Sequence, residues 1–402
     1  MTHDHDDMLW RTETLEIVRN LRESALSQQS TETVPLDSIA ERTLADSILA
    51  SEHKPAHDHA TMDGYAFDAT DDYPLRVLDA EVFPETDPPQ LDPGEAIKIA
   101  TGAPLPSRAN AVLKREEAEV TDGQLTGPSI EPGTYTYERG SNVQAGEQLF
   151  AAGERLTAKD AILLGDLGYD EIAVTDRFAV GILATGTEIH EGRMTDLDSP
   201  MLSSLVRSWG HNPTYEGTVP DDYDRVKDAI AGLAEDYDVV LTTGGTSVGH
   251  KDYVIRALEE LGEIQFHRVR VRPGKPIAVA ELDGAIVFAI PGKPLGAYTI
   301  STLVMRPFFT GQADLPTRDA TLSHDVSLGP DGFEYAVPVT LDGTHAVPLG
   351  HVASPLQVYE DTFDPSVLSS STRATRADGF VLTRSDLRSD ETVDVVPYPV
   401  LE

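Results

Sequence analysis

Between residues 178 and 312, short apolar runs alternate with stretches whose apolar residues recur every three or four positions. The first kind predicts buried strands and the second amphipathic helices. The expected strands are FAVGILATG (178–186), PTYEGTV (213–219), DVVLTTGG (238–245), EIQFHRVRV (263–271) and AIVFAIPG (285–292). The expected helices are MLSSLVRSWG (201–210), DDYDRVKDAIAGLAEDY (221–237), YVIRALEELG (253–262) and LGAYTISTLVMRPFF (295–309). Repeated strand and helix units predict a mostly parallel sheet with helices on both faces.

The flanking regions have other patterns. Residues 8–28 predict an amphipathic helix, and residues 36–50, with Pro35 and Asp37 at the start, predict a second one. Between residues 70 and 145, nine prolines interrupt short alternating runs, which excludes long helices and favours a separate β-rich domain. In residues 313–402, short runs of alternating apolar and polar residues are separated by turn residues, as in a small β-barrel or sandwich.

Ligands of open parallel sheets bind beyond the carboxyl ends of the strands, so the loops there are the candidate site. These loops consist mostly of small residues, and together they contain several carboxylates and three cations. They span residues 184–188, 219–222, 243–247, 272–275 and 291–293. The loop at 243–247 follows a strand and precedes a helix. Its glycines permit a close backbone approach, and free N–H groups at a helix start bind anions. It matches neither GxGxxG nor GxxxxGK[ST], and a plain tight connection remains the alternative.

The charged residues of these loops are of two kinds. Glu188, Asp221 and Asp252 are hard oxygen ligands of the type that Mg²⁺ takes, usually one or two together with substrate phosphate and water. Arg272, Lys275 and Lys293 are anion binders. A cleft with both sets would hold a phosphorylated ligand bridged to a metal ion, although acids are so frequent in this chain that any one of them could be a solvated surface residue.

Composition narrows the function further. The formal net charge is −37, from 31 Lys and Arg against 68 Asp and Glu, which argues against nucleic acid or anionic membrane as a partner. Acids occur throughout the chain, so we interpret it as adapted to high salt, with an ordinary acidic soluble protein as the alternative. There is no cysteine, no apolar run long enough to span a membrane and no secretory signal, and we expect a cytoplasmic protein.

Seven motifs occur in a fixed order. They are MDGYA (62–66), TGAPLP (101–106), ATGTE (184–188), PDD (220–222), TTGGTSVGHKDY (242–253), RPGKP (272–276) and IPGKP (290–294). With them the chain resembles the molybdopterin molybdenumtransferases, the MoeA family, which also includes the E domain of gephyrin. The resemblance covers nearly the whole length.

The resemblance implies a four-part subunit of a homodimer. The parts would be a helical hinge (1–52 with 145–177), a β-rich lobe (53–144), a molybdopterin-binding αβα domain (178–312) and a C-terminal β-barrel (313–402). The implied reaction inserts molybdate into adenylylated molybdopterin, supplied by a molybdopterin adenylyltransferase, with Mg²⁺ and release of AMP.

The resemblance also implies roles for single residues. Glu188, Asp221 and Asp252 would hold Mg²⁺ near the pyrophosphate, while Asp63 and Thr101 would reach the cleft from the β-rich lobe of the partner subunit. The backbone from Thr243 through Gly244, Gly245 and Thr246 to Ser247 would cradle the terminal pterin phosphate. The molybdate and pterin end would be lined by Arg272, Lys275, Pro291, Lys293 and Pro294.

The chain departs from the family pattern at three places. Ser141 and Asn142 stand where the family has Glu-Asp, Lys293 replaces the Asn of PGNP, and Ser199-Pro200 replaces a Ser-Asn or Thr-Asn pair. Two readings follow: lineage drift in a salt-adapted enzyme, or a specialised paralogue that handles tungstate or carries molybdopterin without turnover.

Overall fold

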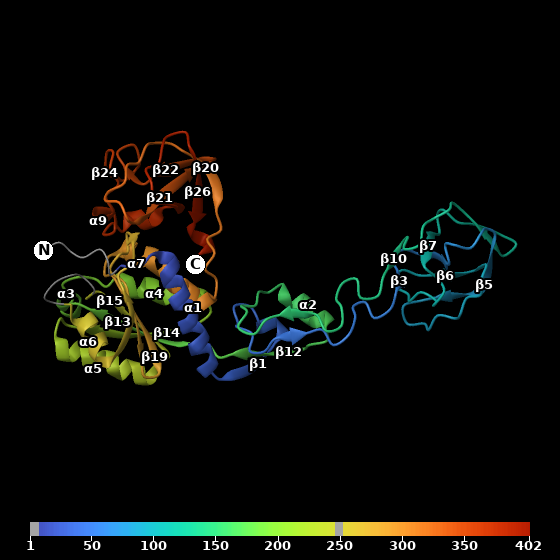
Figure 1. Ribbon diagram of the computed structural model, residues 1–402, viewed down its shortest axis with the longest axis horizontal. Helices are drawn as coiled ribbons and strands as arrows, with labels where there is room; N and C mark the ends of the chain where they lie inside the picture. The colour runs from blue at the N-terminus through green and yellow to red at the C-terminus, as the bar shows by residue number, and fades with distance from the viewer. Residues whose placement is uncertain (1–7, 246–251) are drawn as a thin grey trace. The chain divides into compact units, whose positions relative to one another are not determined.

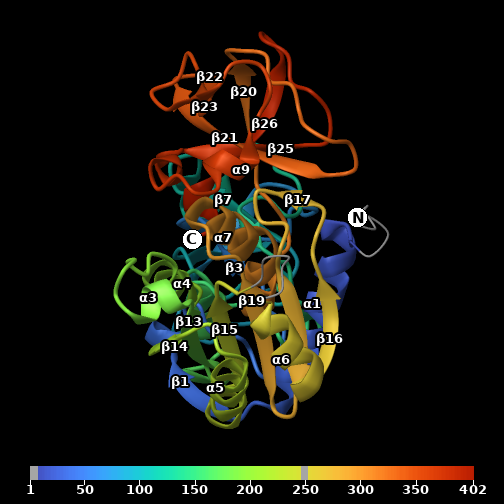
Figure 2. The same ribbon diagram turned by 90° about the vertical axis from the view of Figure 1, so that its left-hand side faces the viewer.

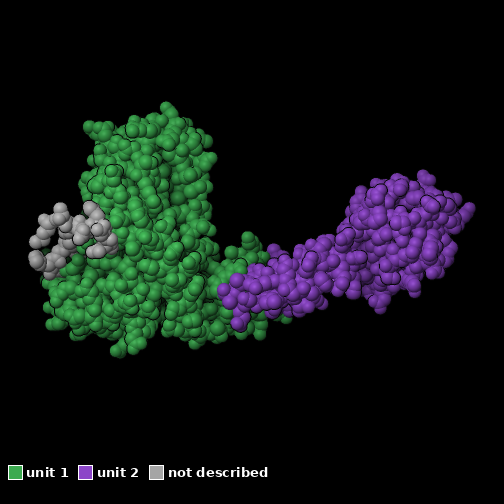
Figure 3. Space-filling view, viewed as in Figure 1, with its two compact units in different colours: residues 1–45, 153–161, 170–402 green, residues 46–152, 162–169 purple. Residues whose placement is uncertain are grey.

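The computed structural model describes residues 8–245 and 252–402. It forms two compact units (Figure 3). Unit 1 contains residues 1–45, 153–161 and 170–402, and unit 2 contains residues 46–152 and 162–169. None of the helices in the described ranges has both the length and the apolar character needed to cross a bilayer. The finer division into four parts stays a prediction.

A six-stranded sheet in the order β14-β13-β15-β19-β18-β16 lies at the centre of unit 1. Its parallel strands are β14 (Asn212–Val219), β13 (Ala179–Thr185), β15 (Val239–Thr243) and β19 (Ala285–Ile290). The antiparallel strands β18 (Ala278–Leu282) and β16 (Gly262–His267) complete the edge. The predicted parallel core is confirmed. Strand β18 was not predicted from the sequence.

Helices cover both faces of this sheet, as expected. One core packs α5 (Tyr223–Asp236) and α6 (Tyr253–Leu261) against alternate strand residues, and these two helices lie side by side (Figures 1 and 2). The other core buries α1 (Arg11–Gln28) and α4 (Asp198–Ser208) on the opposite face. It also contains α7 (Pro294–Ile300), the π-helical turn η2 (Ser301–Met305) and α8 (Arg306–Thr310). Successive strand residues point to opposite faces, which is why both cores are apolar.

The C-terminal region of unit 1 is a closed barrel rather than a sandwich. Its strands are β20 (Arg318–Leu322), β21 (Glu334–Asp342), β22 (His345–Pro348), β25 (Gly379–Thr383) and β26 (Thr392–Pro397). They pair in the order β21-β22-β20-β26-β25, and β25 pairs back onto β21. The short strand β17 (Val271–Arg272) runs parallel to β21, so the sequence just before Pro273 is shared between the central domain and the barrel.

The helix predicted over residues 36–50 is wrong. Only a 3-10 turn at Leu36–Ser38 and strand β2 (Ile48–Leu49) form there. Glu41 has φ 67°, a left-handed conformation that ends a helix, and Leu44 pairs with Val174 in extended form. Local helical spacing was therefore overridden by pairing with a distant segment.

The hinge strands β1 (Thr31–Pro35) and β12 (Glu171–Thr175) pair antiparallel in unit 1. The remaining short elements outside the lobe sheet are β3 (His59–Ala60), β10 (Thr136–Tyr137), β11 (Gln148–Phe150), α2 (Asp160–Asp166), α3 (Thr187–His190), β23 (Gly350–His351), β24 (Gln357–Tyr359) and α9 (Pro365–Leu368).

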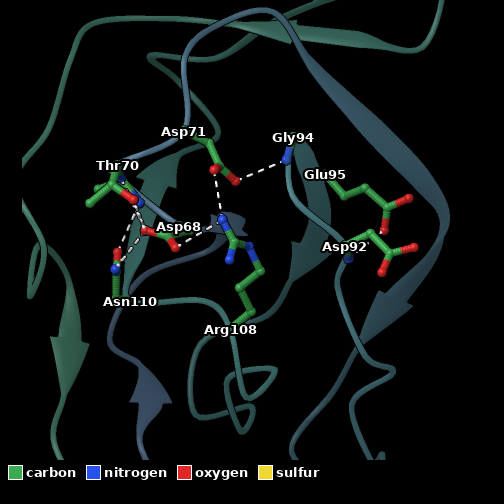
Figure 4. Close-up of polar contacts among 9 residues, drawn as sticks. Asp68, Thr70, Asp71, Asp92, Gly94, Glu95, Arg108 and Asn110 are labelled. Atoms are coloured by element: carbon green, nitrogen blue, oxygen red, sulfur yellow. Dashed lines mark hydrogen bonds and ion pairs between the residues drawn. The ribbon is translucent and has the colours of Figure 1, made fainter.

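Unit 2 contains a second six-stranded sheet, in the order β7-β4-β6-β5-β9-β8. The strands are β4 (Gly64–Phe67), β5 (Leu75–Val82), β6 (Glu95–Ile99), β7 (Ala111–Lys114), β8 (Glu119–Thr121) and β9 (Gln124–Thr126). A polar network fixes its turns (Figure 4). Arg108 bridges Asp71 at 2.7 Å and Asp68 at 3.2 Å, and Asp68 also accepts a hydrogen bond from the Asn110 side chain. These contacts hold loops of the sheet together. The sheet itself confirms the predicted β-rich fold, while the bounds of the lobe at residues 53 and 144 stay a prediction.

Candidate functional site

The loops that follow β13, β14, β15 and β19 are tied together at the carboxyl edge of the sheet. The backbone N–H of Gly186 donates to the Val219 carbonyl at 3.0 Å, and that of Gly244 donates to the Ile290 carbonyl at 3.1 Å. The Thr185 hydroxyl donates to the Thr243 carbonyl at 3.1 Å. The four loops are thus held at one edge by the sheet itself, as the topology predicts.

Glycine is required where these loops meet. Gly244 has φ 87°, and a Cβ on it would lie 2.7 Å from the Thr185 carbonyl oxygen. A Cβ on Gly292 would lie 3.1 Å from the Gly244 Cα. Only glycine fits at position 244, and position 292 is tight, so the turn is specified by the packing between loops as well as by any ligand. Thr246 and Ser247, the predicted end of the phosphate cradle, lie outside the described residues.

Two of the predicted carboxylates meet at α3. The Thr187 N–H donates to the Asp221 carboxylate at 3.2 Å, and the Asp221 N–H donates to the Thr187 hydroxyl at 3.0 Å. Asp221 therefore positions the start of α3. The Glu188 carboxylate folds over Gly186, since a Cβ on that glycine would lie 3.4 Å from Glu188 Oε1. The structure brings these two acids to the same turn.

Asp252 stands at the start of α6, in a partly buried position. Its Oδ1 is buried and has no hydrogen-bond partner within the described residues. Burial raises the pKa of Asp252 to about 6, although the Arg268 cation opposes the shift. An orphaned carboxylate oxygen of this kind fits a cation that would satisfy it.

No group of three or more His, Asp or Glu side chains in residues 8–245 and 252–402 is already arranged to hold a metal ion. A Mg²⁺ site needs only one or two carboxylates, because phosphate oxygens and water supply the rest. Metal binding by Glu188, Asp221 and Asp252 therefore stays a prediction. Its structural argument is the buried Oδ1 of Asp252, which has no partner among residues 8–245 and 252–402.

Asp198 is a buried carboxylate that the sequence reading missed. It is the first residue of α4 and is 7% exposed. The Thr243 hydroxyl donates to its Oδ2 at 3.0 Å, while its Oδ1 is buried without a partner in the described chain. Burial raises its pKa to about 6, and Asp196 contributes to the shift. Asp198 thus supports the strand end from which the glycine turn begins.

Asp198→Asn is expected to stabilise the protein at pH 8 by roughly 1–2 kcal/mol and to change little below pH 4, near the unfolded pKa. The folded pKa lies above the usual value of 3.8, so the stability tied to this carboxyl is present at low pH and is lost as the pH rises through about 6. Urea unfolding at the two pH values measures the difference, with the exposed Asp228→Asn as control. Equal effects at both pH values would contradict the assignment.

Three cations, Arg272, Lys275 and Lys293, line a pocket of about 250 Å³. Arg272 packs its guanidinium over the Phe333 ring at 4.1 Å, and Lys293 donates to the Ser366 carbonyl at 3.3 Å. Burial, together with the Arg272 and Arg268 cations, lowers the pKa of Lys275. The pocket is also lined by Pro291, Gly296, Ser366 and Ser369. The predicted cations are therefore brought together.

The predicted strand over residues 263–271 ends early, and this changes how Arg272 reaches the site. Strand β16 stops at His267, and Arg268 has φ 74°. Residues 272–275 lead into β18 instead of leaving a parallel strand. Since β18 is antiparallel to β19, its start lies at the carboxyl end of β19. The cations consequently lie at the expected edge of the sheet, but on a segment that enters a strand there rather than on one that leaves it.

Comparison with known proteins identifies the family. Residues 12–168 match the family described as "MoeA N-terminal region (domain I and II)", and residues 181–311 match "Probable molybdopterin binding domain". The chain is 30% identical to the molybdopterin molybdenumtransferase of Bacillus subtilis over 303 residues, 70% of either chain. It is 31% identical to that of Synechococcus elongatus over 315 residues, 72% of this chain and 76% of the relative. The chain belongs to the molybdopterin molybdenumtransferase family.

Like the other molybdopterin molybdenumtransferases, the protein is a transferase of molybdenum cofactor biosynthesis. The fold agrees. A solved molybdopterin biosynthesis MoeA protein from Pyrococcus horikosii is 28% identical and superposes with a TM-score of 0.70, covering 97% of this chain and 99% of that one. The resemblance drawn from seven ordered motifs is confirmed.

The two predicted residues of the lobe lie together in unit 2 of the molybdenumtransferase. Asp63 Oδ1 accepts hydrogen bonds from both the backbone N–H and the hydroxyl of Thr101, each at 2.8 Å. These bonds lower the pKa of Asp63. Asp63 remains ionised and fixed at the surface of the lobe, and Thr101 is the residue that fixes it. The departure at Asn142 lies in the same unit and is exposed.

Ser366 and Ser369 are the site residues that the sequence could not supply. They belong to the segment around α9 in the C-terminal region, which has no motif of its own. The Ser369 carbonyl accepts the Leu295 N–H at 3.0 Å, near the start of α7. Lys293 precedes α7 in the family's Asn position and cannot accept a helix N–H, so this carbonyl provides part of the missing cap.

Proposed function

We propose that the protein transfers molybdenum from molybdate to adenylylated molybdopterin, in a Mg²⁺-dependent reaction that releases AMP. One observation carries the proposal. Along the sheet order β14-β13-β15-β19-β18, the acids Asp221 and Glu188 follow the first two strands, the glycine turn follows β15, and the cations flank β19 and β18. A substrate with phosphate at one end and a metal oxyanion at the other matches this order.

The acidic end would serve the adenylyl bond. Asp252 and Glu188 would hold Mg²⁺, with Asp221 keeping α3 in position. The ion would neutralise charge on the pyrophosphate oxygens. The Asp252 carboxylate competes for the ion with a proton, because its pKa is about 6.

The basic end would receive molybdate. Arg272, Lys275 and Lys293 line one pocket, and a doubly charged oxyanion would offset most of their positive charge. The turn at Thr243, Gly244 and Gly245 would present backbone N–H groups to the pterin phosphate, and Pro291 and Pro294 would bound the pterin. Water would hydrolyse the adenylyl bond, so that AMP leaves with its phosphate. The two dithiolene thiols would replace one oxygen ligand of molybdate, which leaves as water with the two thiol protons.

Asp63 and Thr101 would complete the site from the lobe of a partner subunit, in a homodimer whose donor is a molybdopterin adenylyltransferase. The test is AMP release from adenylylated molybdopterin in molar salt. We expect release only when both molybdate and Mg²⁺ are present. Release that is independent of either component, or no release at all, would overturn the proposed reaction.

Asn142 favours a second function, a pterin carrier without turnover, because an amide replaces a family carboxylate. Asn142→Asp separates the two. A carrier binds pterin tightly and gains little from the substitution, whereas a weakened enzyme gains turnover strongly. Replacing molybdate by tungstate in the same assay tests the specialised-paralogue reading, which predicts faster AMP release with tungstate.

A further inference from the structure

Three arginines lie together in unit 1, two of them buried and one partly buried. Arg22 of α1 is 6% exposed and Arg306 of α8 is 3% exposed, while the side chain of Arg155 is 15% exposed. We call Arg22, Arg155 and Arg306 the arginine cluster. Burying guanidinium groups is costly unless they are fully paired, and here it also removes cations from the surface of a chain with net charge −37.

Contacts with two glycines show how the cluster is assembled. Arg22 Nη2 donates to the Gly153 carbonyl at 3.3 Å, and Arg155 lies two residues further along that segment. A Cβ on Gly311 would lie 3.1 Å from Arg22 Cζ. Gly311 ends α8, the helix that Arg306 begins. Arg22 is therefore placed between the two segments that carry the other arginines.

Electrostatic repulsion acts between the cations of the cluster. Burial and then the Arg155 cation lower the pKa of Arg22 to about 10. Burial and then the Arg306 cation lower the pKa of Arg155. His211 lies close by and is kept neutral: the Phe178 N–H donates to its Nδ1, so its Nε2–H donates to the Phe309 carbonyl at 3.0 Å. Burial is the main reason that its pKa falls to about 4, and the cluster adds to the shift.

The cluster is incompletely satisfied. The Nε atoms of Arg22, Arg155 and Arg306 are all buried, and none has a hydrogen-bond partner in the described part of the chain. Arg155 pairs with Glu41, and Arg306 Nη2 donates to the Asp314 carbonyl at 2.7 Å. Glu23, Glu41 and Asp314, the acids beside the cluster, are themselves exposed. Three buried Nε–H donors thus lack an acceptor within the described residues.

We infer that the arginine cluster binds a small inorganic anion, such as chloride. An acceptor without a side chain would satisfy the Nε–H donors and offset the mutual repulsion of the guanidinium groups. The anion must be small, because the backbone at Gly153 and Gly311 lies directly against Arg22. Since Arg22, Arg155 and Arg306 come from three distant segments, bound anion would stabilise the folded state alone and would be released on unfolding.

The experiment is an unfolding titration in which sodium chloride replaces sodium glutamate at constant sodium concentration and ionic strength. Release of one anion predicts that the unfolding equilibrium constant falls about 10-fold for each 10-fold rise in chloride above the dissociation constant. Arg155→Met is expected to lose this dependence. The matched control Arg388→Met, an exposed cation of a surface ion pair, is expected to keep it. Equal dependence in both variants, or none in the wild type, would overturn the inference.

A second measurement applies even if Arg155→Met does not fold. Wild-type crystals grown in sodium bromide are expected to give an anomalous peak within hydrogen-bonding distance of the cluster's Nε atoms. Absence of such a peak at molar bromide would overturn the inference. Titrations with sulfate and phosphate compare oxyanions: a dependence that begins at a lower anion concentration than with chloride, and that Arg155→Met loses, would support the site and assign it to an oxyanion.

Discussion

Asp252→Asn is expected to slow AMP release by at least ~10-fold at pH 8, since that is the low end for losing a group that stabilises charge in the transition state. The substitution keeps the shape of the side chain and removes the charge that would hold Mg²⁺. Single-turnover AMP release at saturating Mg²⁺ measures it. The exposed neighbour Glu259→Gln is the matched control, because it changes charge beside Asp252 without touching the proposed ligands.

The pH dependence gives this prediction a second readout. The folded pKa of Asp252 is raised to about 6, so protons displace the metal as the pH falls below that value, and wild-type enzyme should need more Mg²⁺ at pH 5.5 than at pH 8. The Asn variant should lack this change.

Stability is the control for folding. Stability linked to a carboxyl with a raised pKa is present below the unfolded value and is lost as the pH rises through about 6. Asp252→Asn should therefore be at least as stable as the wild type at pH 8. A variant that is equally stable and releases AMP at the wild-type rate would remove Asp252 from the mechanism.

The parts predicted well from the sequence are those whose pattern is local. The apolar strands β13, β15 and β19 and the glycine turn after β15 carry their signals within a few residues. Residues 36–50 carry a helical pattern too, yet they form only a 3-10 turn and short extended pieces, one of which pairs Leu44 with Val174, far along the chain. The local spacing of apolar residues contains no information about such a competing contact.

The candidate site divides in the same way. Glu188, Asp221, Arg272 and Lys275 belong to loops with recognisable residues, and the structure places them at the expected edge. Ser366 reaches the cation pocket only because the barrel docks there, and Asp198 is distinguished only by its burial against Thr243. Residues of this second kind are defined by tertiary contacts, so an isolated sequence gives no signal for them.

Dialysis from 2 M to 0.1 M sodium chloride is expected to unfold part of the protein. The net charge is −37, and burial removes as many acids (Glu95, Asp198, Glu334) as arginines (Arg22, Arg42, Arg306) among the described residues, so the surface carries this excess of negative charge. Lowering the salt from about 1 M to 0.1 M extends the range of charge repulsion from roughly 3 Å to 10 Å. Repulsion among exposed carboxylates then acts across whole faces of each unit.

Unit 2 should unfold first as the salt falls, because its ratio of acidic to basic residues is higher than that of unit 1. Two probes separate the units. Both tryptophans, Trp10 and Trp209, belong to unit 1, so their fluorescence reports on that unit, whereas far-ultraviolet circular dichroism reports on both. We expect the dichroism to change at a higher salt concentration than the fluorescence. Repeating the dialysis in sodium glutamate separates screening from anion binding, since screening stabilises both units in either salt. Unchanged dichroism and fluorescence at 0.1 M would contradict the salt adaptation inferred from the charge.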